Sequence, residues 1–184
     1  MSTQQSIGRL IREYKLIEQK KNERSNDKLL NEITFTNLTI MYVKYFVLSC
    51  ASYFEEEYNI IIEKIAERVQ DKHANALTTY IKPNFFQVFN TKGSDKKEWN
   101  AGKFYASVGI TNDIKDLKQK DGEFKKLEQS FLSIIQTRNN LVHNDFIEYN
   151  IGDSFQMLET MYSDGIKYIN YIKKLLKIDE CDEQ

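Results

Sequence analysis

The chain has 184 residues, of which 41% are hydrophobic and 29% are charged, and its formal net charge is -1. These values are typical of one globular domain and exclude a polycationic protein, so any contact with nucleic acid must come from a local basic patch. One proline and seven glycines are few for this length, which favours long helices.

The N-terminus and the cysteines bear on location. The first ten residues, M-S-T-Q-Q-S-I-G-R-L, hold no apolar segment of the kind found in a signal peptide, and no apolar run approaches a membrane span. Cys50 lies in an apolar segment and Cys181 in an acidic tail, a pattern that fits neither a disulfide framework nor a metal site. We therefore expect a cytoplasmic protein in a reducing compartment, without a membrane partner, metal or cofactor.

Two helices are predicted in the first part of the chain. The first runs from about Thr3 to Arg24, and the basic residues at its end form either a solvated face or a phosphate-contacting patch. Ser25 to Leu38 is a polar transition where the helix breaks or changes direction. The second helix runs from about Thr36 to Gln70 and is the longest. Its apolar stripe is Ile40, Val43, Val47, Cys50, Ala51, Phe54, Tyr58, Ile61, Ile65 and Val69.

The middle of the chain lacks a long periodic pattern. Asp71 to Tyr80 is a candidate short helix that ends or kinks at Pro83. Residues from about 84 to 111 are rich in aromatic side chains and turn residues, and we expect an irregular insert there. Within it, Phe104 to Ile110 alternates loosely, which indicates a short strand or an irregular cover.

Two more long helices are predicted after the insert. One begins between Asn112 and Glu123 and carries apolar residues at steps of three and four, namely Phe124, Leu127, Phe131, Ile134 and Leu141. The last begins near Asp153 or Ser154, where Asp153 and Gln156 resemble a capping box.

The expected fold class is therefore all-α. The four long helices form an antiparallel bundle, with the irregular, aromatic-rich insert at about 84–111 between the second and third. We expect a single helical domain over residues 1–178, followed by an acidic tail at 179–184.

The segment Q-T-R-N-N-L-V-H-N-D-F, from Gln136 to Phe146, stands out. Arg138 falls in register with the apolar stripe of its helix, and a guanidinium there must find a partner, water or an anionic ligand. His143 follows five residues later, near the expected helix end. It is one of two histidines, and histidine is the side chain best suited to proton transfer near neutral pH.

Arg138 and His143 together suffice for RNA cleavage without a metal. Histidine can take the proton from a 2′-OH or give one to the leaving 5′-oxygen, while arginine binds the phosphate oxygens and stabilises their growing charge. The sequence has no Gly-rich phosphate loop, metal-ligand cluster or nucleophile elbow. Asp113, Glu123 and Lys125 could be read as the acidic pattern of a nuclease. They lie on a helical pattern, whereas such sites need strands, so we do not expect a nuclease site of that kind.

R-N-N-L-V-H resembles the R-x(4–6)-H signature of the HEPN superfamily, in which a polar residue such as Asn139 commonly follows the arginine. A-S-Y-F-E, from Ala51 to Glu55, resembles the A-x-x-F-E segment of many members. The resemblance implies a metal-independent endoribonuclease that dimerises with the motif at a shared groove and leaves 2′,3′-cyclic phosphate and 5′-OH ends. Small members of this kind are often toxins or anti-phage effectors.

The predicted catalytic residues are Arg138 and His143, with Asn139, Glu55 and Asn144 in support. One chain offers one credible catalytic histidine, so a homodimer would supply the acid and base pair. The expected partners are an RNA substrate, a second copy of the chain, and an antitoxin or another defence-system protein.

Structural alternatives remain open. Arg138 could be a buried ion-pair partner of Glu55, and His143 could interact with the helix dipole. His73 lies in a charged segment without a motif, and we expect no catalytic role for it. The alternative function is a catalytically silent helical module that binds nucleotide or RNA, or scaffolds a partner.

Overall fold

The computed structural model describes residues 2–23, 28–68, 79, 85–89 and 100–178, with the backbone alone at 22–23, 28–33 and 87. Every regular element in these ranges is a helix. The all-α class is therefore confirmed. The candidate helix at 71–80 (apart from helical Thr79), Pro83, His73 and the tail at 179–184 lie outside the described residues.

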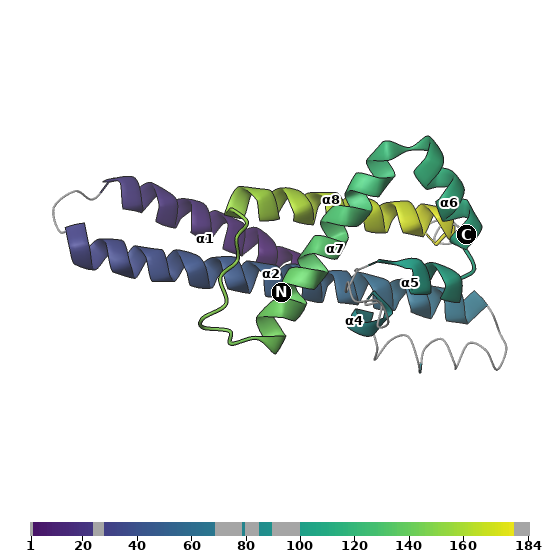
Figure 1. Cartoon of the computed structure of the whole chain (residues 1–184), viewed down its shortest axis with the longest axis horizontal. Helices are drawn as coiled ribbons and strands as arrows, with labels where there is room; N and C mark the ends of the chain where they lie inside the picture. The colour runs from purple at the N-terminus through teal and green to yellow at the C-terminus, as the bar shows by residue number, and fades with distance from the viewer. Residues whose placement is uncertain (1, 24–27, 69–78, 80–84, 90–99, 179–184) are drawn as a thin grey trace.

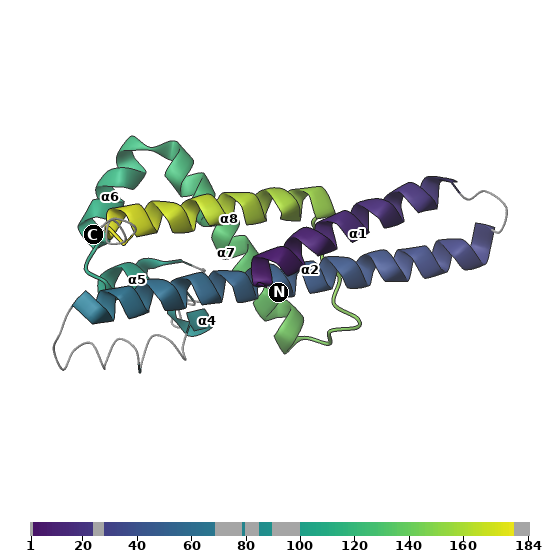
Figure 2. The same ribbon diagram turned by 180° about the vertical axis from the view of Figure 1, so that it is seen from behind.

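Four long helices carry the fold. They are α1 (Thr3–Glu23), α2 (Lys28–Arg68), α7 (Gly122–His143) and α8 (Phe155–Leu175). Helices α1 and α2 form an antiparallel hairpin, and α8 lies along the other half of α2 (Figure 1). Helix α7 crosses α2 obliquely in both views (Figures 1 and 2), so a simple antiparallel bundle of four helices is not confirmed.

The core follows the apolar stripe predicted for α2, because helical residues three and four apart share a face. Val47, Ala51, Phe54 and Ile61 are fully buried. The stripe is less buried at its beginning, where Ile40 is 38% exposed. The α1–α2 hairpin extends past the end of α8 there, which leaves this part of α2 with fewer covering helices (Figure 1).

Helix α2 begins at Lys28, eight residues before the expected start at Thr36. The polar residues in this segment were expected to compete with helical hydrogen bonds. Directly after the segment, the Thr39 hydroxyl donates to the Phe35 carbonyl at 2.8 Å, one turn earlier. A hydroxyl satisfied in this way is compatible with a continuous helix.

The expected insert contains helices in its described part, α4 (Phe85–Val88) and α5 (Gly102–Ser107), and is followed by α6 (Thr111–Lys120). The expectation of a strand or irregular cover at Phe104 to Ile110 is wrong. Ala101, Phe104 and Tyr105 are buried, a spacing that belongs to a helix.

Side-chain caps set the starts of the last two helices. The Asp121 carboxylate accepts from the backbone N–H of Glu123 at 2.9 Å and begins α7. Ser154 caps α8, because its hydroxyl accepts from the Met157 N–H at 3.3 Å. The cap expected at Asp153 is thus one residue too early.

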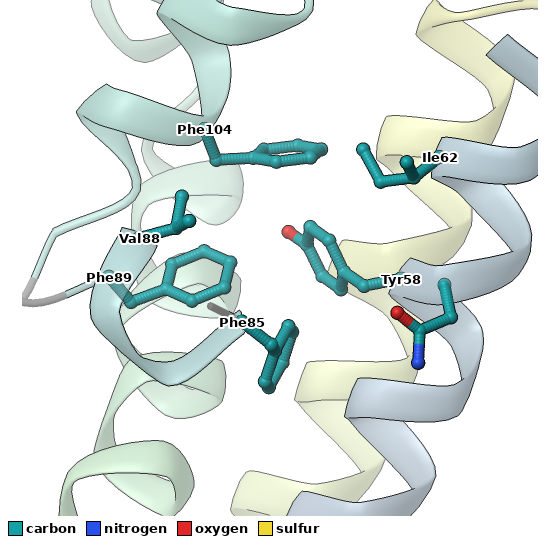
Figure 3. A pocket seen from close by; sticks show the side chains of 7 residues that line it. Tyr58, Ile62, Phe85, Val88, Phe89 and Phe104 are labelled. Atoms are coloured by element: carbon teal, nitrogen blue, oxygen red, sulfur yellow. The ribbon is translucent and has the colours of Figure 1, made fainter. Parts of the chain in front are cut away.

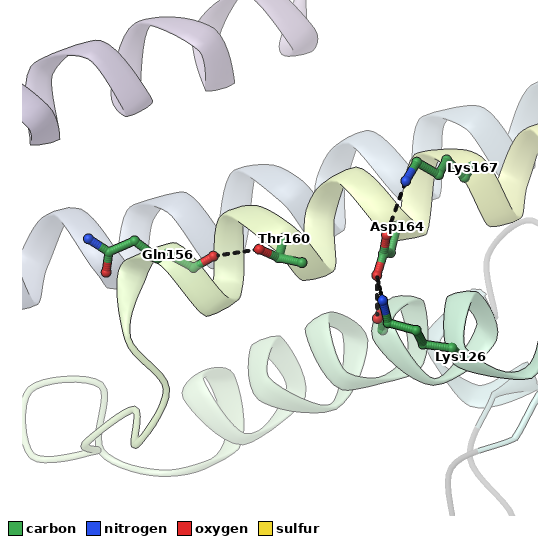
Figure 4. Close-up of polar contacts among 6 residues, drawn as sticks. Lys126, Gln156, Thr160, Asp164 and Lys167 are labelled. Atoms are coloured by element: carbon green, nitrogen blue, oxygen red, sulfur yellow. Dashed lines mark hydrogen bonds and ion pairs between the residues drawn. The ribbon is translucent and has the colours of Figure 1, made fainter. Parts of the chain in front are cut away.

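Helices α7 and α8 are joined by a buried carboxylate as well as by apolar contacts. Asp164 of α8 is 5% exposed and accepts from the Ser130 hydroxyl at 3.3 Å. Lys126 and Lys167 lie 3.6 and 3.4 Å from its oxygens (Figure 4). The charge is therefore compensated, as a buried carboxylate requires.

None of the described helices has the length and hydropathy needed to cross a lipid bilayer.

Gly165 allows α8 to approach α2 closely, which generates a test of the packing. A Cβ added there would lie 2.3 Å from Cζ of the fully buried Phe54. We expect Gly165→Ala to lower the free energy of unfolding by about 1–3 kcal/mol, as overpacking does. Chemical denaturation measures this. Gly122→Ala is the matched control, because its added Cβ meets nothing within 4 Å. Equal stability of the two variants would contradict the packing of α8 on α2.

Candidate functional site

Arg138 is half-buried on α7, at a position whose neighbours along the same face, Ile134, Ile135 and Leu141, are fully buried. Its guanidinium carbon lies 3.7 Å from the centroid of the Phe86 ring on α4. Burial lowers the pKa of Arg138, and the nearby Glu55 carboxylate opposes this shift. An arginine nevertheless stays protonated at physiological pH.

Glu55 is the expected ion-pair partner, and its position explains only part of the Arg138 environment. It is half-buried on α2 and close enough to act electrostatically on Arg138. Across the described ranges, however, no ion pair or hydrogen bond joins Arg138 to a carboxylate. Within the part of the chain that the structure describes, the guanidinium thus contacts an aromatic ring, and its N–H donors make no ion pair with a carboxylate.

His143 is the last residue of α7, and its side chain is exposed. The next residue, Asn144, is the C-cap. Its backbone and side-chain N–H groups both donate to the carbonyl of Asn140, at 3.0 and 2.7 Å. Asn144 therefore closes the helix directly behind His143, which is a structural contribution to the site.

Arg138 and His143 do not touch each other in one chain. Residues five apart lie about 140° apart around a helix, whereas Asn139 and His143, four apart, lie on nearly the same side. No hydrogen bond or ion pair of the described residues links the arginine to the histidine. Asn139 is half-buried beside them. The structure thus places the motif residues at one end of α7, while their roles stay predictions.

A buried lysine that the sequence reasoning missed holds the loop after His143. Lys44 of α2 is 1% exposed, and its ammonium donates to the carbonyls of Phe146 and Ile147 at 2.6 and 2.9 Å. The same ammonium lies 5.3 Å from the centroid of the Phe146 ring. Asn140 adds a second link to the loop by donating to the Tyr149 hydroxyl at 3.3 Å.

The signal for Lys44 was present in the sequence. It lies three residues before Val47 and seven before Ala51, in the apolar stripe of α2, just as Arg138 lies in that of α7. Phe86 gave no such signal, because F-F-Q-V does not reveal which ring faces the core and which faces Arg138. Among the described side chains, no group of three or more His, Cys, Asp or Glu is arranged to hold a metal ion.

The role of Lys44 can be tested by a change that removes the ammonium and keeps most of the apolar stem, Lys44→Met. Two loop carbonyls lose a charged donor, so we expect a loss of about 1–3 kcal/mol in unfolding free energy. Backbone amide exchange should become faster at residues 144–149.

Lys15→Met is the control, because Lys15 is exposed and makes a surface ion pair with Glu159 at 3.0 Å. We expect its effect to stay within about 0.5 kcal/mol. Unchanged stability and unchanged exchange in Lys44→Met would show that Lys44 does not hold the loop.

Comparison with known proteins agrees with the resemblance to the HEPN superfamily. The family model described as RiboL-PSP-HEPN matches residues 7–178, which is nearly the whole chain. No curated protein and no solved structure matches this chain. Because the match covers the helix of Arg138 and His143 together with the helices that pack on it, the chain belongs to the RiboL-PSP-HEPN family of the HEPN superfamily.

Proposed function

We propose that this protein is a metal-independent endoribonuclease that cleaves RNA by attack of a 2′-OH on the neighbouring phosphate. The observation that carries the proposal is the half-buried Arg138, which makes no ion pair with a described carboxylate and lies in the same helical segment as the exposed His143. A desolvated guanidinium with free donors is well suited to a phosphodiester. HEPN membership supports a role in RNA processing.

Each motif residue has a defined task in this chemistry. Arg138 donates to the non-bridging phosphate oxygens and stabilises the charge that develops on them. His143 takes the proton of the attacking 2′-OH or gives a proton to the leaving 5′-oxygen. The products end in a 2′,3′-cyclic phosphate and a 5′-OH. Asn139, on nearly the same side of α7 as His143, assists by orienting the phosphate or its neighbours.

A second copy of the chain would complete the site, because one chain offers one histidine in the motif. Exposed apolar side chains flank that motif. Val142 on the last turn of α7 is 50% exposed, Ile147 in the loop 82%, and Tyr45 on α2 51%. The Tyr45 ring lies 6.4 Å from that of Phe146, next to Ile147. Exposed apolar side chains that gather in one place commonly mark an interface, so we assign Val142, Ile147 and Tyr45 to a two-fold dimer interface.

The alternative function is a catalytically silent module that binds RNA or nucleotide, or scaffolds a partner. The observation in its favour is that no described side chain hydrogen-bonds to His143 and orients its ring, which a general base normally requires. This alternative predicts RNA binding through Arg138 without cleavage.

A biological role as a toxin or anti-phage effector, with an antitoxin or another defence protein as partner, rests on the resemblance to other HEPN proteins. Growth arrest on expression that disappears in His143→Ala would support it. Growth unaffected by the wild-type protein, expressed on its own, would count against it.

Cleavage assays on variants test the two motif residues. We expect His143→Ala to abolish RNA cleavage, because the proton transfer loses its carrier, and Arg138→Ala to reduce the rate roughly 100- to 1000-fold. Asn139→Ala should reduce it less. The measurement is the initial rate on a mixed RNA, with circular dichroism as the check on folding.

Lys125→Ala is the matched control, since Lys125 is an exposed cation at the other end of α7. Full activity in His143→Ala would mean that the site is wrongly assigned. RNA that stays whole with wild-type protein freed of co-purified inhibitor would favour the silent module.

The dimer has its own test, Ile147→Glu. We expect a charge in the apolar interface to give a monomer in sedimentation experiments at micromolar concentration and to abolish cleavage, because the two histidines separate. Leu16→Glu is the control, since Leu16 is a 55% exposed apolar residue on α1, a helix that holds none of the motif residues. A wild-type protein that is monomeric and fully active at micromolar concentration would contradict the shared site.

A further inference from the structure

Helix α4 is fixed against the core by two aromatic side chains one turn apart. Phe85 and Phe89 are 4% and 1% exposed, and their ring centroids lie 5.4 and 5.2 Å from that of Tyr58 on α2. Figure 3 shows both rings turned toward Tyr58 from the α4 side. The backbone of α4 is therefore held in a defined position relative to α2.

Phe86 follows Phe85 directly, so it leaves α4 in a different direction. Its ring is half-buried, and Phe85 packs against it edge to face, with centroids 4.9 Å apart and planes at 80°. The guanidinium of Arg138 lies 3.7 Å from the Phe86 centroid. A ring held by α4 thus lies directly against the cation.

A contact of this kind leaves open the edge of the guanidinium that bears its N–H donors. Arginine prefers to stack a flat face on an aromatic ring, and its N–H donors then point outward in the plane of the group. Arginine side chains have many rotamers, and a ligand that had to select one would bind more weakly. The Phe86 contact restricts those rotamers before a ligand arrives, and it does so without an ion pair between the guanidinium and a described carboxylate, although Glu55 acts on it electrostatically.

We propose that Phe86 is a positioning residue, which holds the Arg138 guanidinium by stacking so that its donor edge is ready for the non-bridging oxygens of an RNA phosphodiester. This inference deepens the proposed function and rests on it for the identity of the ligand. Helix α4, which lies in the segment expected to be an irregular insert, would then contribute to the site.

The test compares Phe86→Leu, which keeps an apolar side chain but loses the aromatic face, with Phe86→Tyr, which keeps that face. The probe is an RNA oligonucleotide with a 2′-O-methyl group at every nucleotide, which can bind but offers no 2′-OH for attack. We expect Phe86→Leu to weaken binding roughly 3- to 30-fold, the range of a lost cation–π contact, and Phe86→Tyr to bind like the wild type. Phe86→Leu should have no further effect when Arg138 is already alanine.

A second readout does not depend on RNA. Protons of the Arg138 side chain should show an upfield ring-current shift in NMR spectra, lost in Phe86→Leu and kept in Phe86→Tyr. Tyr171→Leu is the control, because Tyr171 is a partly exposed ring that contacts Phe124 and Asp121 at the other end of α7. Thermal denaturation checks that all variants fold.

The outcomes separate this inference from the proposed function. If the wild type binds the oligonucleotide but cleaves no RNA, and Phe86→Leu still shows the weakened binding and the lost shift, the ribonuclease proposal fails and the positioning role stands. Equal binding by Phe86→Leu and wild type, an equal loss in the Arg138→Ala background, or no rescue by tyrosine would overturn the positioning role. So would a wild-type protein that does not bind the oligonucleotide.

Discussion

The site depends on one physical constraint, the placement of a permanent cation in the apolar face of a core helix. Ile134, Ile135 and Leu141 are fully buried around Arg138 on α7. A guanidinium at such a position costs free energy unless something compensates it. The ring of Phe86 and the field of Glu55 supply part of that compensation. In the proposed function, an RNA phosphate supplies the remainder.

The sequence predicted those parts of the fold that depend on local patterns. The all-α class, the extent of α1 and the presence of α7 and α8 follow from apolar residues at helical spacing, which repeats within one element. The same reasoning singled out Arg138, because a charged residue in an apolar stripe is visible without a structure. The superfamily was also predicted correctly, since the motif spacing is a local property of one helix end.

Features that need partners from distant segments could not be predicted. Phe86 reaches Arg138 only because Phe85 and Phe89 anchor α4 on α2, and F-F-Q-V alone does not distinguish these rings. The close approach of α8 to α2 depends on Gly165, where an added Cβ would meet Phe54. Helix α5 was mistaken for a strand or irregular cover because its six residues are too few to show a clear period. Lys44 was overlooked although it gave the same signal as Arg138.

The central claim is that Arg138 and His143 cleave RNA by attack of its own 2′-OH. The most direct measurement uses an oligodeoxynucleotide that contains a single ribonucleotide, incubated with the protein in excess chelator, followed by mapping of the ends. The account predicts one cut, on the 3′ side of the ribonucleotide, with a 2′,3′-cyclic phosphate on one product and a 5′-OH on the other. Cutting elsewhere, 5′-phosphate ends or a requirement for a divalent ion would contradict it.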